Sequence, residues 1–156
     1  MDEDNSLASG ALIEDNPGEI GELDGVLGFH IRLAHGAVYR HFSETFAGLG
    51  LTQKQVSVLW LVADLPGIAQ IELGSRLQMD RATTMTIVNR LQERGYLRRE
   101  RSESDGRKQS LYLTEAGEGA LVEAKGCISQ HEAWLKSRFS EEEIEKLVEM
   151  LARIHE

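Results

Sequence analysis

The spacing of the apolar residues changes from helical to alternating at Gly95, and this change constrains the fold more than any other feature of the chain. Before Gly95, apolar residues recur at helical intervals after a capping residue, Asp80. After it, residues 96–101 and 109–113 alternate between apolar and polar around a turn that contains Asp105-Gly106. Gly95 stands where a helix commonly ends with a left-handed residue. The sequence therefore predicts a helix followed directly by a two-stranded hairpin.

Three more helices are predicted before Asp80. Residues 23–49 carry apolar side chains at spacings of three and four, which is typical of a long amphipathic helix. Thr52 is placed to cap a second helix, which Leu65-Pro66-Gly67 would end. A short helix follows over residues 70–77, and Gln78-Met79 forms the turn before Asp80.

Two helices are predicted after the hairpin. Thr114 begins a long one, with a kink or interruption expected near Gly126 because glycine weakens a helix. Ser140 with Glu143 resembles a capping box and begins the last helix.

Charge is unevenly distributed along this acidic chain, whose formal net charge is -9. Residues 70–113 hold nine Lys and Arg against six Asp and Glu, whereas residues 1–25 hold eight acids and no base. Residues 114–156 are acidic again, with ten acids and five bases. A basic middle between acidic ends indicates a polyanionic partner, although a solvated charged surface would give the same counts.

The helix that starts after Asp80 has two chemically different faces. Its predicted buried stripe consists of Thr84, Ile87, Val88 and Leu91. The opposite face, with no bulky apolar residue and no acid expected on it, carries Arg81, Ala82, Thr83, Thr86, Asn89 and Arg90. Such a face suits the major groove of DNA, although an ordinary solvent-exposed face has the same residue types. The hairpin cations Arg107 and Lys108 favour the DNA interpretation, because helix and hairpin together would make a two-point contact.

Residues 71–121 resemble the MarR family of bacterial transcription regulators. The resemblance rests on the helix at 73–77, the recognition segment at 83–91, ERGYLRR at 93–99, DGR at 105–107 and LTEAG at 113–117. It implies a mainly α fold with a small β-hairpin wing: a winged helix-turn-helix flanked by long dimerisation helices. The corresponding segments are an acidic, mostly disordered arm (1–22), a dimerisation helix (23–50), the DNA-binding region (51–113) and C-terminal dimerisation helices (114–156).

The resemblance also assigns roles to the wing. It implies that Arg107 enters the minor groove and that Asp105 braces the wing by pairing with an arginine. Gly106 stands where the family often has a second arginine, so one phosphate contact is expected to be missing.

A homodimer is expected because the flanking helices carry more apolar surface than a small winged domain can cover. Family members form a two-fold dimer that places two recognition helices roughly 34–36 Å apart, one turn of DNA. The expected partner is therefore double-stranded DNA with an imperfect palindrome.

The family commonly releases DNA when an aromatic carboxylate or related metabolite binds between the dimer helices and the winged domain. Arg32, His35 and Tyr39 lie near one another on the first predicted helix, and Trp60 could supply an aromatic wall. They are the candidate ligand residues, with Arg32 pairing an anionic group. A solvated helix face on which Arg32 pairs with a nearby acid explains the pattern equally well. Aromatic acids and their acyl-CoA thioesters both remain candidates.

An enzyme, a metal site and a cofactor are not expected. The sequence contains no HExxH, CxxC or GxSxG motif, and the single cysteine, Cys127, is interpreted as a packed side chain within a helix. The five histidines do not share a ligand spacing: His30, His35, His41, His131 and His155. No signal peptide or membrane span is apparent, which is typical of a cytoplasmic protein.

Two classes of function follow from these patterns. The first is a dimeric, ligand-responsive transcriptional regulator, a repressor released from its operator by a small aromatic acid or its acyl-CoA thioester. The alternative is a winged-helix module for protein–protein association with little affinity for DNA.

Overall fold

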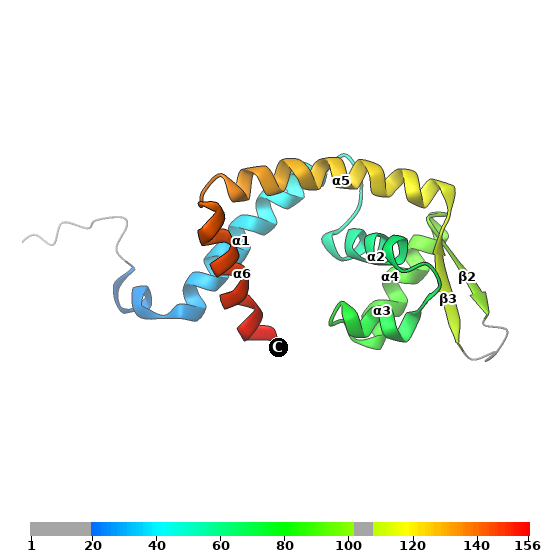
Figure 1. Ribbon diagram of the computed structural model, residues 1–156, viewed down its shortest axis with the longest axis horizontal. Helices are drawn as coiled ribbons and strands as arrows, with labels where there is room; N and C mark the ends of the chain where they lie inside the picture. The colour runs from blue at the N-terminus through cyan, green and yellow to red at the C-terminus, as the bar shows by residue number, and fades with distance from the viewer. Residues whose placement is uncertain (1–19, 102–107) are drawn as a thin grey trace, which may run out of the picture. The chain divides into compact units, whose positions relative to one another are not determined.

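The computed structural model describes residues 20–101 and 108–156 (Figure 1). The chain forms two compact units, residues 1–37 and 38–156, and helix α1 (Leu27–Phe46) contributes to both. Before α1 lies a short 3-10 helix, η1 (Gly21–Gly25). The helix predicted from residue 23 therefore begins later, because Val26 is extended (φ -95°, ψ 106°) and separates η1 from α1. Most of the predicted acidic arm lies outside the described residues.

The second unit contains the predicted helix-turn-helix, formed by α2 (Gln53–Asp64), α3 (Gln70–Arg76) and α4 (Arg81–Glu93). Thr52 and Gln55 form a capping box at the start of α2, so the predicted cap is confirmed. Asp80 caps α4 by accepting a hydrogen bond from the backbone N–H of Thr83 at 2.7 Å. Gly95, just after the end of α4, adopts the predicted left-handed conformation, with φ +76°.

The sheet has three strands in the order β1-β3-β2, all antiparallel. Strands β2 (Leu97–Arg101) and β3 (Gln109–Leu113) are the predicted hairpin arms. Strand β1 (Ile68–Ala69) was not predicted, since two residues are too few to show an alternating pattern. Ile68 pairs with Leu111, which places β3 in the centre of the sheet and joins the hairpin to the start of α3.

Two helices complete the chain, α5 (Glu115–Lys136) and α6 (Glu141–His155). Ser140 and Glu143 form the predicted capping box of α6. The interruption expected near Gly126 is wrong, because α5 is continuous over 22 residues. A glycine costs about 1 kcal/mol in a helix, and burial of other α5 side chains, Leu121 and Ala124 among them, opposes that cost.

The core of the second unit joins the helices to the hairpin. Side chains with under 2% exposure come from α2, α3, α4, β2 and β3: Leu59, Leu73, Leu91, Leu97 and Leu111 are the largest. Figure 1 shows α2, α3 and α4 gathered beside the strands. This is the predicted mainly α winged fold, and its packing fixes the face that α4 turns outward. Cys127 packs against the core, as predicted.

Candidate nucleic-acid interface

Helix α4 presents the predicted outward face. Thr84, Ile87, Val88 and Leu91 are buried, as the apolar spacing indicated. Of the six residues predicted on the opposite face, Arg81, Ala82, Thr86 and Arg90 are exposed, and Thr83 and Asn89 are half-buried. The face therefore exposes cations and small polar side chains.

The expectation that this face lacks a bulky apolar residue is wrong. Met85 is 51% exposed and follows Ala82 by three positions, so it belongs to the same face. Residue type alone favours a core position for methionine, so its exposure here depends on the packing of α3 and α4.

Arg99 on β2 connects the hairpin to both helices of the helix-turn-helix. Its guanidinium donates to the side-chain oxygens of Asn89 (2.6 Å), Gln92 (2.9 Å) and Gln70 (3.2 Å). Gln70 belongs to α3, whereas Asn89 and Gln92 belong to α4. Arg99 thus positions the wing against α4. No pattern in the sequence predicts this role for Arg99 beyond its alternate position in the strand.

The same contact restricts Asn89. A bidentate contact to adenine requires an asparagine to accept with Oδ1 and donate with Nδ2. Oδ1 of Asn89 already accepts from Arg99, which leaves one lone pair of Oδ1 and the two Nδ2 donors for other partners. Thr86 is restricted in a similar way, because its hydroxyl donates to the carbonyl of Ala82 at 2.9 Å.

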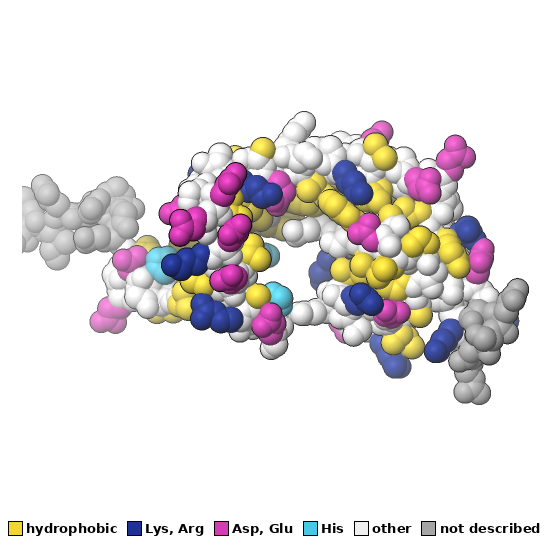
Figure 2. Space-filling view, viewed as in Figure 1, with side chains coloured by type: hydrophobic (Ala, Val, Ile, Leu, Met, Phe, Trp, Pro, Cys, Tyr) yellow, Lys and Arg dark blue, Asp and Glu magenta, His cyan; other side chains and the backbone are white. Residues whose placement is uncertain are grey.

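The wing residues are described in part. Lys108 is exposed immediately before β3 and borders a hollow of about 540 Å³ that Gln70 and Ile71 of α3 also line. Asp105 and Arg107 lie outside the described residues. Figure 2 shows Lys and Arg side chains along the lower edge of the region of α3, α4 and the strands, with hydrophobic side chains beside them.

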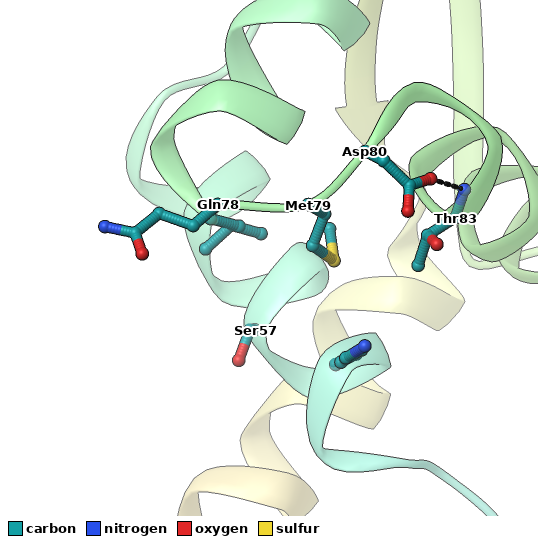
Figure 3. A pocket seen from close by; sticks show the side chains of 7 residues that line it. Ser57, Gln78, Met79, Asp80 and Thr83 are labelled. Atoms are coloured by element: carbon teal, nitrogen blue, oxygen red, sulfur yellow. Dashed lines mark hydrogen bonds between the residues drawn. The ribbon is translucent and has the colours of Figure 1, made fainter. Parts of the chain in front are cut away.

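A smaller hollow, of about 200 Å³, lies where the N-terminal part of α2 meets the turn before α4 (Figure 3). Its wall includes Asp80 and Thr83, which form the cap of α4, and Lys54 and Ser57 of α2. Hydrogen bonds from Thr83 lower the pKa of Asp80, and Lys54 lowers it slightly further. The carboxylate therefore occupies the positive end of α4, which leaves the side chains of this helix, and not its N-terminus, available to an anion.

A separate cavity of about 270 Å³ lies within the second unit, between the end of α1, α2 and α5. Trp60, one of the four predicted ligand residues, lines it together with Phe42, Gln53 and His131. Tyr39 is 55% exposed on α1, and Arg32 and His35 are exposed in the first unit. The guanidinium of Arg32 lies 5.2 Å from the ring centroid of Phe29.

His131, which lines this cavity, contacts a second histidine, His41. The Nδ1 atoms of His41 and His131 share a hydrogen bond of 2.8 Å, and His41 stacks on Trp134 with a centroid distance of 4.0 Å. Burial lowers the pKa of His131, and the neighbouring His41 lowers it further, whereas Glu132 opposes the shift. His131 therefore favours the neutral form, which can accept or donate a hydrogen bond.

The described residues hold no group of three or more His, Cys, Asp or Glu that could bind a metal ion. No helix in the described part of the chain is both long enough and apolar enough to cross a membrane.

Known proteins resemble this chain over nearly its whole length. Residues 49–108 match the MarR family model. A putative transcriptional regulatory protein for the hcr operon of Thauera aromatica is 30% identical over 136 residues, which are 86% of this chain and 82% of that protein. Transcriptional regulator HosA of Escherichia coli O157:H7 is 32% identical over 67% of this chain and 77% of its own.

Solved structures agree with these relatives. The transcriptional repressor CouR bound to a 23-mer DNA duplex is 33% identical, covers 88% of this chain and 98% of its own, and superimposes with a TM-score of 0.84. CouR bound to p-coumaroyl-CoA is 31% identical over 87% of this chain and 96% of its own, with a TM-score of 0.78. The outward face of α4, its attachment to the wing and these similarities lead to one conclusion: the chain belongs to the MarR family, and it is a winged helix-turn-helix regulator of transcription that binds DNA.

Proposed function

We propose that this protein is a homodimeric repressor that binds a palindromic operator and leaves it when an aromatic acyl-CoA thioester or aromatic acid binds. The observation that carries the proposal is the outward face of α4, with Arg81, Ala82 and Thr86 exposed beside a wing that Arg99 holds. We assign DNA contacts to this face, with Arg81 to base edges and Arg90 and Lys108 to phosphates. Arg107 in the minor groove and Asp105 as a wing brace remain predictions.

The dimer is supported by apolar side chains that each unit leaves exposed. On α6 these are Val148, Met150, Leu151 and Ile154, and in the first unit they include Leu23, Leu27, Ile31 and Leu33. A contiguous apolar helix face of this kind is costly in water and typical of an interface between subunits. In a two-fold dimer, the two copies of α4 would contact half-sites about one helical turn apart.

Arg81→Ala should weaken binding to the operator by about 1–3 kcal/mol and weaken binding to random-sequence DNA much less, because a base contact carries sequence information. The measurement is fluorescence anisotropy with a duplex that the protein selects from a random pool and with an unselected duplex. Arg138→Ala is the matched control, since Arg138 lies over Trp134 beyond α5. Equal losses on both duplexes would make Arg81 a phosphate contact.

The same assay tests the DNA-binding function itself. Each phosphate neutralised by the wild-type protein changes the slope of log K against log salt concentration by about -0.9. A flat slope would favour the alternative, a winged-helix module for protein association.

We assign the effector to the cavity between α1, α2 and α5. Its aromatic and aliphatic walls, with Trp60 and Phe42 among them, suit a planar ring, and its volume of about 270 Å³ suits the acyl portion of a larger ligand. Glu132 also lines the cavity and pairs with Lys136 at 3.2 Å. A thioester carbonyl is uncharged and can accept a hydrogen bond from Gln53 or His131, which both line the cavity. The thioester bound by CouR supports this choice of ligand class.

Trp60→Ala should leave operator affinity nearly unchanged and raise the effector concentration needed for release roughly tenfold, because the variant loses an aromatic wall worth about 1.4 kcal/mol. The probes are p-coumaroyl-CoA, p-coumarate and CoA, each added to the protein–operator complex. Trp60→Phe, which keeps an aromatic wall, is the control. The same release assay with Arg32→Ala tests the prediction that Arg32 pairs with an anionic part of the ligand. If the Trp60→Ala variant leaves the operator at the effector concentration that releases wild type, the pocket lies elsewhere.

A further inference from the structure

The outward face of α4 continues into an apolar ledge. Met85 is 51% exposed and Ile71, on α3, is 68% exposed. Both side chains line a hollow of about 430 Å³ between α3 and α4, to which Gln70, Arg81 and Ala82 also contribute. The ledge is therefore a concave apolar surface with a cation at its border.

The charges and polar groups around the ledge fit DNA. Arg81 lies four positions before Met85 on α4, and Lys108 borders the adjacent hollow that Ile71 also lines. Glu72 also lines that adjacent hollow, and its carboxylate pairs with Arg76 at 2.8 Å. Arg81 and Lys108 are complementary to the phosphates beside a groove. The ledge is thus continuous with the DNA-binding face assigned above.

Two hydrogen-bonding groups of this face are partly engaged within the protein. Oδ1 of Asn89 accepts from Arg99, and the hydroxyl of Thr86 donates to the Ala82 carbonyl. Arg81 is suited to guanine, whose N7 and O6 accept a bidentate contact. An A·T pair presents polar groups in the major groove and one apolar group, the 5-methyl of thymine, and the methyl is the group that an apolar ledge can contact.

We propose that Met85 and Ile71 recognise thymine 5-methyl groups in each operator half-site, which makes them specificity-determining residues. The unbranched thioether of Met85 can adapt to a methyl group at more than one depth in the groove. Ile71 would cover the same methyl, or one on the next base pair, from the side of α3. The proposal rests on the operator-binding function proposed above.

The test removes the methyl groups from the DNA. The duplex that the protein selects from a random pool is synthesised with thymine or with uracil, which differ only at C5, and affinities are measured by anisotropy. Burying one methyl corresponds to about a threefold to fivefold change in affinity, so the loss of one in each half-site should weaken wild-type binding roughly tenfold.

Met85→Ala and Ile71→Ala decide whether the ledge is responsible. Met85→Ala should bind the thymine duplex about as weakly as wild type binds the uracil duplex, and it should distinguish the two duplexes less than twofold. Ile71→Ala should reduce the discrimination in part. Val122→Ala, which truncates an apolar side chain that is 71% exposed on α5, should keep the full discrimination.

Two results would overturn the inference: equal wild-type affinity for both duplexes, or a tenfold discrimination that persists in Met85→Ala and so reflects DNA shape. Either result leaves the regulator function intact, because the thymine duplex still binds. Failure of wild type to bind any selected duplex would instead overturn the operator-binding function, and the inference with it.

Discussion

Gly117→Ala is expected to lower the free energy of unfolding by about 3–5 kcal/mol. A Cβ at this position would lie 2.0 Å from the backbone carbonyl oxygen of Tyr96. That carbonyl also accepts a hydrogen bond from the backbone N–H of Thr114 at 3.1 Å, so the start of α5 is held against the start of the hairpin. Because the added Cβ is fixed to the backbone and the Tyr96 oxygen belongs to the backbone, no change of side-chain rotamer relieves the clash.

Urea unfolding followed by circular dichroism measures this loss. Gly119→Ala is the matched control on the same helix, since no atom lies within 4 Å of its Cβ position. This control should gain about 0.5–1 kcal/mol from the higher helix propensity of alanine. A Gly117→Ala variant within 1 kcal/mol of wild type would show that α5 can move away from Tyr96 at little cost.

Arg99→Met should reduce affinity for the selected operator at least tenfold and lower the free energy of unfolding by about 1–3 kcal/mol. Methionine keeps an unbranched apolar stem in place of the arginine methylenes but loses the donors to Gln70, Asn89 and Gln92. The wing then loses its attachment to α3 and α4, so the helix and the wing no longer fit the duplex together. We expect the effect to be one of position, because the guanidinium is committed to protein oxygens.

The stability measurement separates this role from a direct DNA contact. Loss of one phosphate contact alone changes the slope of log K against log salt by about 0.9 and leaves the free energy of unfolding nearly unchanged, whereas loss of the attachment lowers the free energy of unfolding as well. Arg98→Met is the neighbouring control: its guanidinium lies over the ring of Tyr112 and pairs with Glu100 at the surface. An exposed pair of this kind contributes about 0–1 kcal/mol. Equal losses of stability in the two variants would contradict the role given to Arg99.

The local features of the fold were predictable from the sequence. Thr52, Asp80 and Ser140 cap their helices as predicted, and Gly95 adopts the predicted left-handed conformation. Each depends on groups within a few residues, since a capping side chain bonds the backbone three positions later. The buried stripe of α4 was predictable for a similar reason: the helical repeat fixes which residues share a face. The family resemblance placed these elements in a winged fold.

Only the tertiary structure decided which groups of that face are available to DNA. Arg99 reaches Gln70 across 29 positions and Asn89 across 10, and no local pattern marks that meeting. Strand β1 exists because Ile68 meets Leu111, and the need for glycine at 117 comes from Tyr96. Met85 remains exposed because α3 and α4 leave a hollow at its side. The sequence by itself determined the helices, their caps and the outward face of α4, because those depend on neighbours along the chain. Packing decided the attachment of the wing and the chemistry left on that face, because these depend on atoms brought together from distant positions.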